Sequence, residues 1–182
     1  MGNGVCGVQP TLAQSWKQHG SGGPNLPVTL PLTGPFGIEC RTGPIAGNHQ
    51  VIITLLGAPS SITDVKVTPG QGGTASVANS SVAGNQVTVN LTNVSDAQLL
   101  TIDLLGVTIG ASAGDVIVPM GVLLGDVNAT TLVDDNDVSV VQGSTRQTLD
   151  NNTFRRDVNT TGLIDGNDVA LTQGNTRNGI SP

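Results

Sequence analysis

Two runs of oxygen-bearing side chains near the C-terminus have the residue types and spacing of calcium ligands. Each run places Asp, Asn, Thr, Asp and Asp at positions 1, 3, 5, 9 and 12 of a twelve-residue segment. Calcium binds six to eight oxygen atoms, and a loop of this length supplies them from those positions and from the main-chain carbonyl at position 7. The predicted ligands are Asp126, Asn128, Thr130, Leu132, Asp134 and Asp137 in the first run, and Asp157, Asn159, Thr161, Leu163, Asp165 and Asp168 in the second. The sequence therefore predicts two calcium ions, one in each run.

The two runs belong to an internal repeat with an offset of 31 residues. Residues 126–147 align with residues 157–178, and 13 of the 22 aligned residues are identical. From residue 125 onward the chain has eight Asp and four Arg, a net charge of −4 that two calcium ions would neutralise. The alternative is a pair of solvated turns that hold no metal.

A duplicated loop followed by a short helix resembles the dockerin type of calcium-binding domain, and the resemblance covers residues 125–178. It is carried by the loop pattern, by Asp137 and Asp168 at position 12, and by exiting helices expected at 136–142 and 167–173. It implies a third short helix at 150–156. This chain departs from the dockerin pattern in having Thr at position 5 of both loops and Thr131 at position 6 of the first. We therefore expect weaker calcium binding than in a typical dockerin, weakest in the first loop.

Residues 26–124 have the pattern of a β-sandwich. Short alternating runs such as 86–91 are separated by Gly-, Pro- and Asn-rich turns, and no twelve-residue stretch has helical periodicity. The expected strands are 27–32, 37–41, 50–56, 62–68, 74–79, 86–91, 98–105 and 116–124. This number of strands favours an immunoglobulin-like antiparallel β-sandwich, with an open barrel as the alternative. The expected fold class is mainly β, with a small α-helical dockerin-like domain at 125–182.

Residues 1–25 are expected to form an extended N-terminal segment, engaged in assembly, because they are rich in Gly and Gln and have few apolar positions. Cys6 and Cys40 are the only cysteines. An even number of cysteines in a chain rich in Asn, Thr and Gly is typical of a protein with a disulfide in an oxidising compartment. That bridge could lie within the chain or join two subunits, and the alternative is two buried free thiols.

Several functions are disfavoured by composition. The net charge is −6, with three basic residues in the first 121, which disfavours nucleic-acid binding. Trp16, Phe36 and Phe154 are the only aromatic residues, too few for a stacking platform. No apolar run approaches the roughly 20 residues of a membrane span. His19 and His49 are the only histidines and neither lies in a catalytic motif, so we expect no enzyme activity.

The sequence leads us to expect a calcium-binding extracellular or cell-surface structural protein, whose copies assemble head-to-tail into a fibril or surface layer. The chain is similar, over residues 17–178, to sandwich-plus-dockerin modules of secreted bacterial surface proteins. That similarity is carried by His19-Gly20 and the runs 30–34, 37–41 and 120–128. The alternative is a dockerin-type module that tethers the chain to a cohesin-like partner, and glycan binding is a weaker third. Calcium removal is expected to unfold residues 125–178 and leave the sandwich intact.

Asn-x-Ser/Thr motifs outside the predicted loops mark candidate glycosylation sites. They begin at Asn79, Asn90, Asn93 and Asn151.

Overall fold

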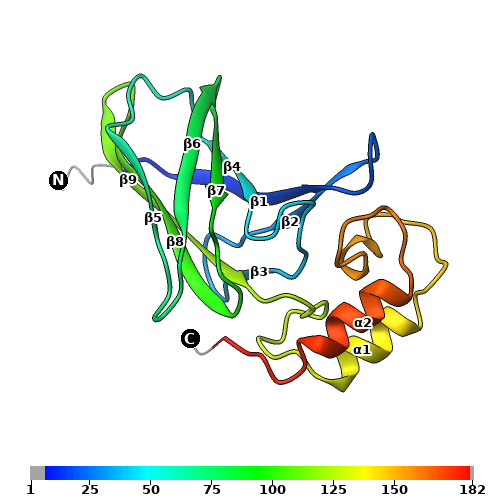
Figure 1. Ribbon diagram of the computed structural model, residues 1–182. Helices are drawn as coiled ribbons and strands as arrows, with labels where there is room; N and C mark the ends of the chain where they lie inside the picture. The colour runs from blue at the N-terminus through cyan, green and yellow to red at the C-terminus, as the bar shows by residue number, and fades with distance from the viewer. Residues whose placement is uncertain (1–6, 181–182) are drawn as a thin grey trace.

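A computed structural model describes residues 7–180 and is mainly β: two sheets form a sandwich-like core, and two short helices follow (Figure 1). The five-stranded sheet has the order β2-β1-β4-β7-β6 and the four-stranded sheet the order β3-β9-β8-β5. Neighbouring strands are antiparallel except for the parallel pair β3 and β9. The strands are β1 (Pro10–Gln18), β2 (Asn25–Thr29), β3 (Gly37–Glu39), β4 (His49–Leu55), β5 (Asp64–Thr68), β6 (Ser76–Ala83), β7 (Gln86–Thr92), β8 (Gln98–Ile109) and β9 (Ser112–Val122). The prediction of a mainly β sandwich followed by helices is thus confirmed.

The sandwich begins earlier than the sequence suggested. Strand β1 lies between β2 and β4, and Ala13 and Ser15 on it are fully buried. Residues 10–25 are therefore part of the sandwich rather than a separate extended segment. The sequence pattern did not predict this strand, because two of its inward positions are Ser15 and Lys17 and apolar and polar residues therefore do not alternate. Residues 1–6, the remainder of that expected segment, lie outside the described residues.

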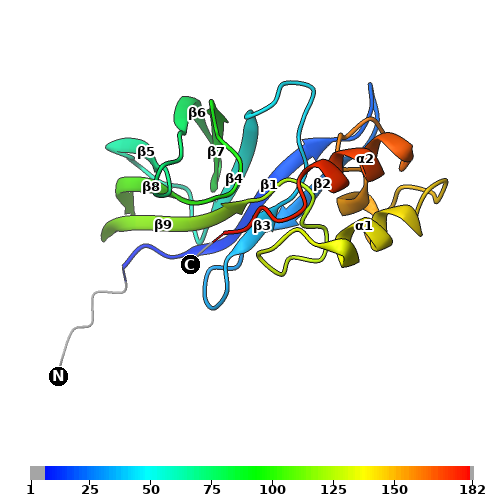
Figure 2. The same cartoon turned by 60° about the horizontal axis from the view of Figure 1, so that its bottom comes forward.

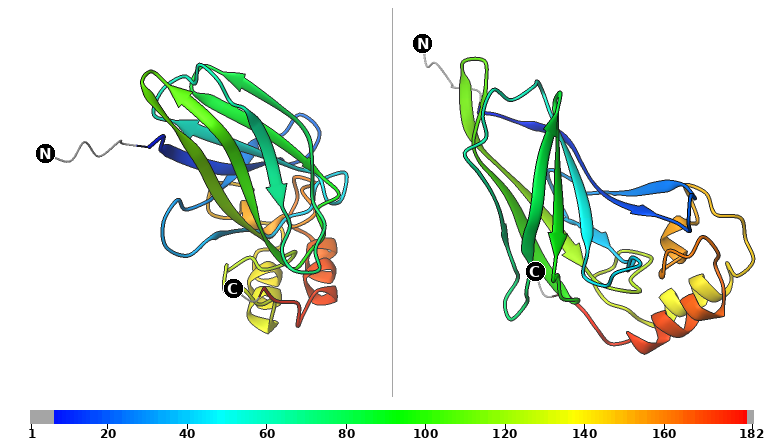
Figure 3. Two further views of the ribbon diagram at one scale, coloured as in Figure 1. Left: turned by 90° about the vertical axis from the view of Figure 1, so that its left-hand side faces the viewer. Right: turned by 45° about the horizontal axis from the view of Figure 1, so that its top comes forward.

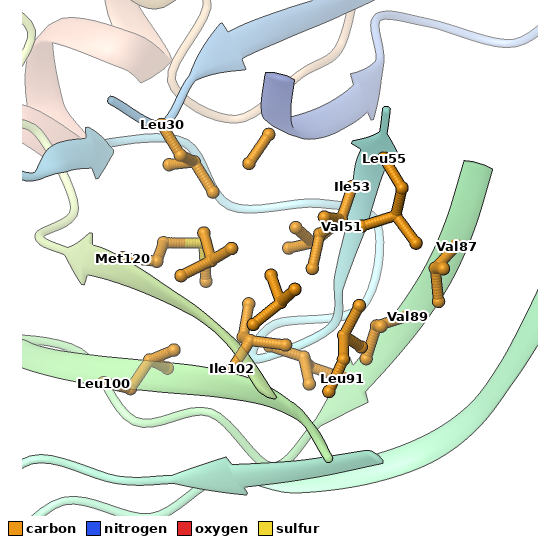
Figure 4. Close-up of a cluster of buried hydrophobic side chains, with 14 of the residues drawn as sticks. Leu30, Val51, Ile53, Leu55, Val87, Val89, Leu91, Leu100, Ile102 and Met120 are labelled. Atoms are coloured by element: carbon orange, nitrogen blue, oxygen red, sulfur yellow. The ribbon is translucent and has the colours of Figure 1, made fainter. Parts of the chain in front are cut away.

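Alternate side chains of facing strands form the main core. Figure 4 shows residues of β4, β7, β8 and β9 filling the space between the sheets. They include Val51, Ile53, Leu55, Val87, Val89, Leu91, Leu100, Ile102 and Met120. Full burial of each such side chain stabilises the folded protein by about 1.5–3 kcal/mol. This apolar core gives the sandwich a scaffold rigid enough to position the polar residues at its end.

The helical unit, residues 125–180, lies beyond one end of the sandwich (Figures 2 and 3). It contains α1 (Asp135–Gln142), the 3₁₀ turn η1 (Phe154–Arg156) and α2 (Gly166–Gly174). The helix expected at 150–156 is only this last turn, because the Asp150 carboxylate accepts hydrogen bonds from the N–H groups of Asn152 and Thr153 and forms a local turn instead. Between residues 7 and 180 no helix is long and apolar enough to cross a membrane.

The helical unit and the sandwich share a buried boundary. One cluster joins Cys40, which follows β3, to Val141 of α1 and Ile164, which precedes α2. A second cluster joins Ile38 of β3 to Ile180 near the C-terminus. The two parts are therefore packed against each other rather than joined by a linker alone.

Candidate metal centre

Loop 1, residues 126–137, folds around the carboxylates at its two ends. The Asp126 oxygens accept hydrogen bonds from the N–H groups of Thr130 (3.0 Å) and Thr131 (2.9 Å). The Asp137 oxygens accept from the N–H groups of Asn128 (3.2 Å) and Asp134 (3.0 Å). These contacts bring the first, third, fifth, ninth and twelfth predicted positions into one closed loop.

Loop 2, residues 157–168, repeats this arrangement. The Asp157 oxygens accept from the N–H groups of Thr161 (3.0 Å) and Gly162 (2.8 Å). The Asp168 oxygens accept from those of Asn159 (3.1 Å) and Asp165 (2.9 Å). In both loops the position-5 hydroxyl donates to the position-7 carbonyl, from Thr130 to Leu132 and from Thr161 to Leu163. The sequence repeat is therefore also a repeat of local geometry.

Position 9 of each loop also begins a helix. Asp134 and Asp165 are the N-caps of α1 and α2, and each caps its helix together with the Asp three residues later. Such a capping box satisfies main-chain N–H groups that the helix leaves unpaired. Asp137 and Asp168 thus both close the loops and help to start the helices.

The two loops differ in backbone strain at position 6. Thr131 has φ +73° and Gly162 has φ +89°. A left-handed conformation costs a residue with a side chain roughly 1–2 kcal/mol, whereas glycine adopts it freely. Loop 1 therefore carries strain that loop 2 avoids at this position.

The loops bury negatively charged carboxylates, and few positively charged side chains lie near enough to balance them. Asp126, Asp137, Asp157 and Asp168 are fully buried, and burial raises the pKa of Asp126 and of Asp168. Among residues 7–180 His19 is the one basic side chain within ion-pair distance of a loop carboxylate, at Asp157. Burying an unpaired carboxylate is costly, and a bound cation removes that cost.

The donor set fits calcium better than a softer metal. In the described part of the chain no three His, Cys, Asp or Glu side chains gather closely enough to hold a metal by themselves. An ion in either loop would also need the amide, hydroxyl and carbonyl oxygens at positions 3, 5 and 7. All of these are hard oxygen donors, which suit calcium rather than zinc or copper.

A chain of buried polar side chains runs from inside the sandwich to loop 2. Ser15 Oγ donates to Glu39 Oε2 at 2.6 Å, and the Arg41 guanidinium donates to both Glu39 oxygens at 2.7 and 2.8 Å. Arg41 Nη1 lies 2.8 Å from His19 Nε2, and His19 Nδ1 lies 2.7 Å from Asp157 Oδ2. We call Ser15, Glu39, Arg41, His19 and Asp157 the junction.

The partners of His19 fix its tautomer. A guanidinium can only donate hydrogen bonds, so Nε2 must accept from Arg41. The ring proton is then on Nδ1 and is donated to Asp157. This is how a carboxylate in a metal site is usually oriented by residues behind it.

Burial and neighbouring charges shift the pKa values of several groups around the junction. Burial alone would raise the pKa of Glu39, but the charge and hydrogen bonds of Arg41 outweigh it and hold that pKa well below its usual range. Burial lowers the pKa of Lys17 to about 8 and that of His49 to about 3. His49 Nδ1 is buried without a hydrogen-bond partner among the described residues. The interior of the sandwich at this end therefore contains polar rather than apolar side chains.

Loop 1 is attached to the sandwich through Arg155 of η1. Its Nη1 donates to the carbonyl of Ile38 on β3 at 2.9 Å. Its Nη2 and Nε donate to the carbonyls of Asp126 and Val127 at 2.8 and 2.9 Å. Both loops are therefore attached to the sandwich by a buried or half-buried side chain.

Sequence reasoning did not identify these linking residues as part of the site. Glu39, Arg41 and His19 lie in chain segments distant from the loops, and no spacing connects them to Asp157. The weak signal available was polarity at alternate positions, Ser15, Lys17 and His19, in an otherwise β-like segment.

Cys40 is a buried free thiol in this structure, and no disulfide is present among residues 7–180. Its Sγ lies 3.5 Å from the carbonyl oxygen of Arg155, and burial raises its pKa to about 11. Cys40 therefore has no disulfide partner among the described residues, and it packs into the apolar cluster at the boundary with the helical unit. Cys6 itself lies outside the described residues.

The candidate glycosylation sites differ in accessibility. Asn79, Asn93 and Asn151 are exposed, whereas Asn90 is half-buried and its amide bonds to Gln50 and Asn79. Glycan attachment at Asn90 would have to break these two bonds.

No protein-family model, no curated protein and no solved structure matches the chain. The candidate centre is therefore defined by its own contacts: two repeated oxygen-rich loops, each attached to the sandwich behind it.

Proposed function

We propose that the protein is a calcium-binding, non-enzymatic structural protein of the cell exterior, whose copies assemble head-to-tail into a fibril or surface layer. The junction is the observation that carries this proposal. Because loop 2 is hydrogen-bonded to His19, calcium bound there would stiffen the sandwich as well as the helical unit. A protein that transmits force along an assembly needs such a rigid connection between its parts.

One calcium ion would be held by each loop through the ligands predicted above. The ion supplies the positive charge that the buried carboxylates lack. The protein's own residues orient those carboxylates: the Gly162 N–H and His19 both hold Asp157 Oδ2. The main-chain N–H groups of loop 1 hold Asp126 in the corresponding way.

The strand order supports an immunoglobulin-like sandwich. The rows β1-β4-β7-β6 and β5-β8-β9 follow the ABED and CFG order of that fold, with β2 as an additional edge strand and β3 beside β9. The repeated loop and helix support the dockerin-like assignment of residues 125–180. Both assignments agree with a scaffolding role.

Strand β6 offers a surface for assembly. It is eight residues long, almost entirely exposed, and contains no charged residue or proline. The other edge strands are protected: β2 contains Pro27, β5 contains Asp64 and Lys66, and β3 has only three residues. An uncharged, exposed edge is a template for an added strand. We propose that a strand from a second copy adds to this edge.

Electron microscopy of the purified protein tests this proposal. We expect filaments in calcium that fray after EGTA is added, and none for Ser80→Lys, which places a charge on the β6 edge. Gln147→Lys adds the same charge on an exposed loop of the helical unit and should assemble normally. Dispersed particles under both conditions, or normal filaments of Ser80→Lys, would refute assembly through β6.

A dockerin-type tether to a cohesin-like partner is the second candidate. It is favoured by paired exposed residues: Leu132 and Leu163, at the same position of the two loops, are 46% and 68% exposed. Asn136 and Asn167 at the helix starts are also exposed. Dispersed particles that bind an isolated cohesin domain only in calcium would favour this function over a fibril.

A further inference from the structure

A cavity of about 440 Å³ lies on the outer face of the five-stranded sheet, away from the calcium loops. It is lined by residues of β1, β2, β4, β6 and β7 and by the segment 43–48, which precedes β4. Its volume is within the range of small-ligand pockets, roughly 300–1,000 Å³. Its lining contains none of the predicted calcium ligands, and it meets the proposed assembly edge only at Ala78 and Asn79 of β6.

One row of side chains crosses the sheet in this cavity. Trp16 pairs with Gln50, Gln50 with Asn90, and Asn90 with Asn79 across four neighbouring strands. The amides are bonded in series: Gln50 Nε2 donates to Asn90 Oδ1 at 3.0 Å, and Asn90 Nδ2 donates to Asn79 Oδ1 at 2.7 Å. Asn90 is therefore held in place and in turn holds its two neighbours.

The ends of this amide row are available to a ligand. Gln50 and Asn79 are both exposed, and the series leaves Gln50 Oε1 as an acceptor and Asn79 Nδ2 as a donor. An acceptor and a donor fixed on a sheet match the paired donor and acceptor capacity of sugar hydroxyl groups.

Two apolar side chains border the same cavity. Trp16 begins the row, and Ile45 on the preceding segment is 64% exposed. An indole ring provides a large apolar surface together with a polar N–H group. The indole N–H of Trp16 is itself buried and has no acceptor among the described residues, so Trp16 offers the cavity apolar ring surface. A ligand with both C–H faces and hydroxyl groups would match these apolar side chains and the amide row together.

The charge of the lining selects a neutral ligand. Lys17 is its one basic side chain apart from His49, and Lys17 Nζ is bonded to the carbonyl oxygen of Asn48. No Arg, Asp or Glu lines the cavity. A phosphate or carboxylate group would therefore find no cation free to pair with it.

We propose that this cavity binds a neutral saccharide, with Trp16 and Ile45 against the ring faces and Gln50 and Asn79 bonded to hydroxyl groups. The small number of aromatic residues argued against sugar binding when counted over the whole chain. The fold places the one tryptophan beside three amides, which changes that argument. The proposal does not rest on calcium binding, whereas Asn79 belongs both to the cavity and to β6, the proposed assembly edge.

Trp16 is the only tryptophan, so intrinsic fluorescence reports directly on the cavity. We would titrate the protein with cellohexaose, chitohexaose, xylohexaose and maltohexaose and repeat each titration by calorimetry. At least one sugar should change the fluorescence saturably and release heat. Each of Gln50→Ala and Asn79→Ala should weaken that binding about 2- to 10-fold, the effect of one hydrogen bond.

Thr88→Ala is the matched control, because Thr88 lies on the same face of β7, two residues from Asn90, but does not line the cavity. It should bind as the unmodified protein does. Circular dichroism of all variants confirms that each is folded. Absence of fluorescence change and heat with every sugar up to its solubility limit would overturn the proposal. Unchanged binding by both amide variants, or binding only of charged sugars in a salt-dependent manner, would also overturn it.

Discussion

Replacement of His19 tests whether the junction supports calcium binding in loop 2. His19 Nδ1 and Asp157 Oδ2 are 2.7 Å apart and both side chains are fully buried. A hydrogen bond to a charged group contributes about 1.5–3 kcal/mol. Loss of a residue that orients a metal ligand typically weakens binding 10- to 100-fold, or about 1.4–2.7 kcal/mol. Both estimates predict that His19→Leu weakens calcium binding at loop 2 by one to two orders of magnitude.

The assay is calcium titration by calorimetry, with loop 1 as an internal reference. Loop 1 should keep its affinity, because the Asp126 carboxylate accepts main-chain N–H groups and makes no contact with His19. His19→Asn should restore most of the loop 2 affinity, since an amide nitrogen can replace Nδ1 as the donor. Ser15→Ala removes the far end of the junction and should leave both sites unchanged. Equal affinities of His19→Leu and the unmodified protein at loop 2 would refute the reasoning.

Three other outcomes follow from the structure. Thr131→Gly should relieve the positive φ of loop 1 and raise its calcium affinity about fivefold, from roughly 1 kcal/mol of strain, as measured by the same titration. Burial, reinforced by the charge of Lys17, lowers the pKa of His49 from 6.5 to about 3. The free energy of unfolding is therefore unaffected by this group above pH 6.5, and it decreases as the pH falls from 6.5 toward 3, because only the unfolded chain then takes up the proton. This group should cost about 2 kcal/mol at pH 5, and urea unfolding of His49→Gln should show a correspondingly flatter pH profile; parallel profiles would contradict it. In a Cys6→Ala background, Cys40 should resist iodoacetamide in calcium and react after EGTA is added, and equal labelling rates would show that chelation does not open the boundary.

Local sequence signals predicted those parts of the fold that depend on local pattern. Strands such as β7 alternate apolar and polar residues, and the loop repeat is visible as identical residues at one offset. Strand β1 was missed because its inward residues Ser15 and Lys17 are polar, and their partners come from β3 and the segment before β4. Buried polar side chains obtain their hydrogen-bond partners through tertiary contacts, and the alternation of apolar and polar residues along the sequence does not reveal those contacts.

The same distinction applies to the candidate centre. The twelve proposed ligand positions depend only on spacing within two short segments of the sequence. The His19–Asp157 contact joins residues 138 positions apart and follows only from how the helical unit packs on the sandwich. The position of Cys40 has the same origin, because the number of cysteines does not show that Cys40 packs against the helical unit as a free thiol.

The junction also alters the expected response to calcium removal. The sequence suggests that residues 125–178 unfold alone and that the sandwich stays intact. However, Asp157 is both a predicted ligand and the hydrogen-bond partner of His19, so loss of loop 2 leaves His19 and Arg41 without that partner inside the sandwich. When the free calcium concentration is 100 times the dissociation constant of a site, binding there adds about 2.7 kcal/mol to the free energy of unfolding of the unit that contains the site. We therefore expect hydrogen exchange after EGTA to increase at the ends of β1 and β3 near the junction, while the apolar core around Ile53 and Ile102 stays protected. Exchange confined to residues 125–180 would show that the junction does not couple the two parts.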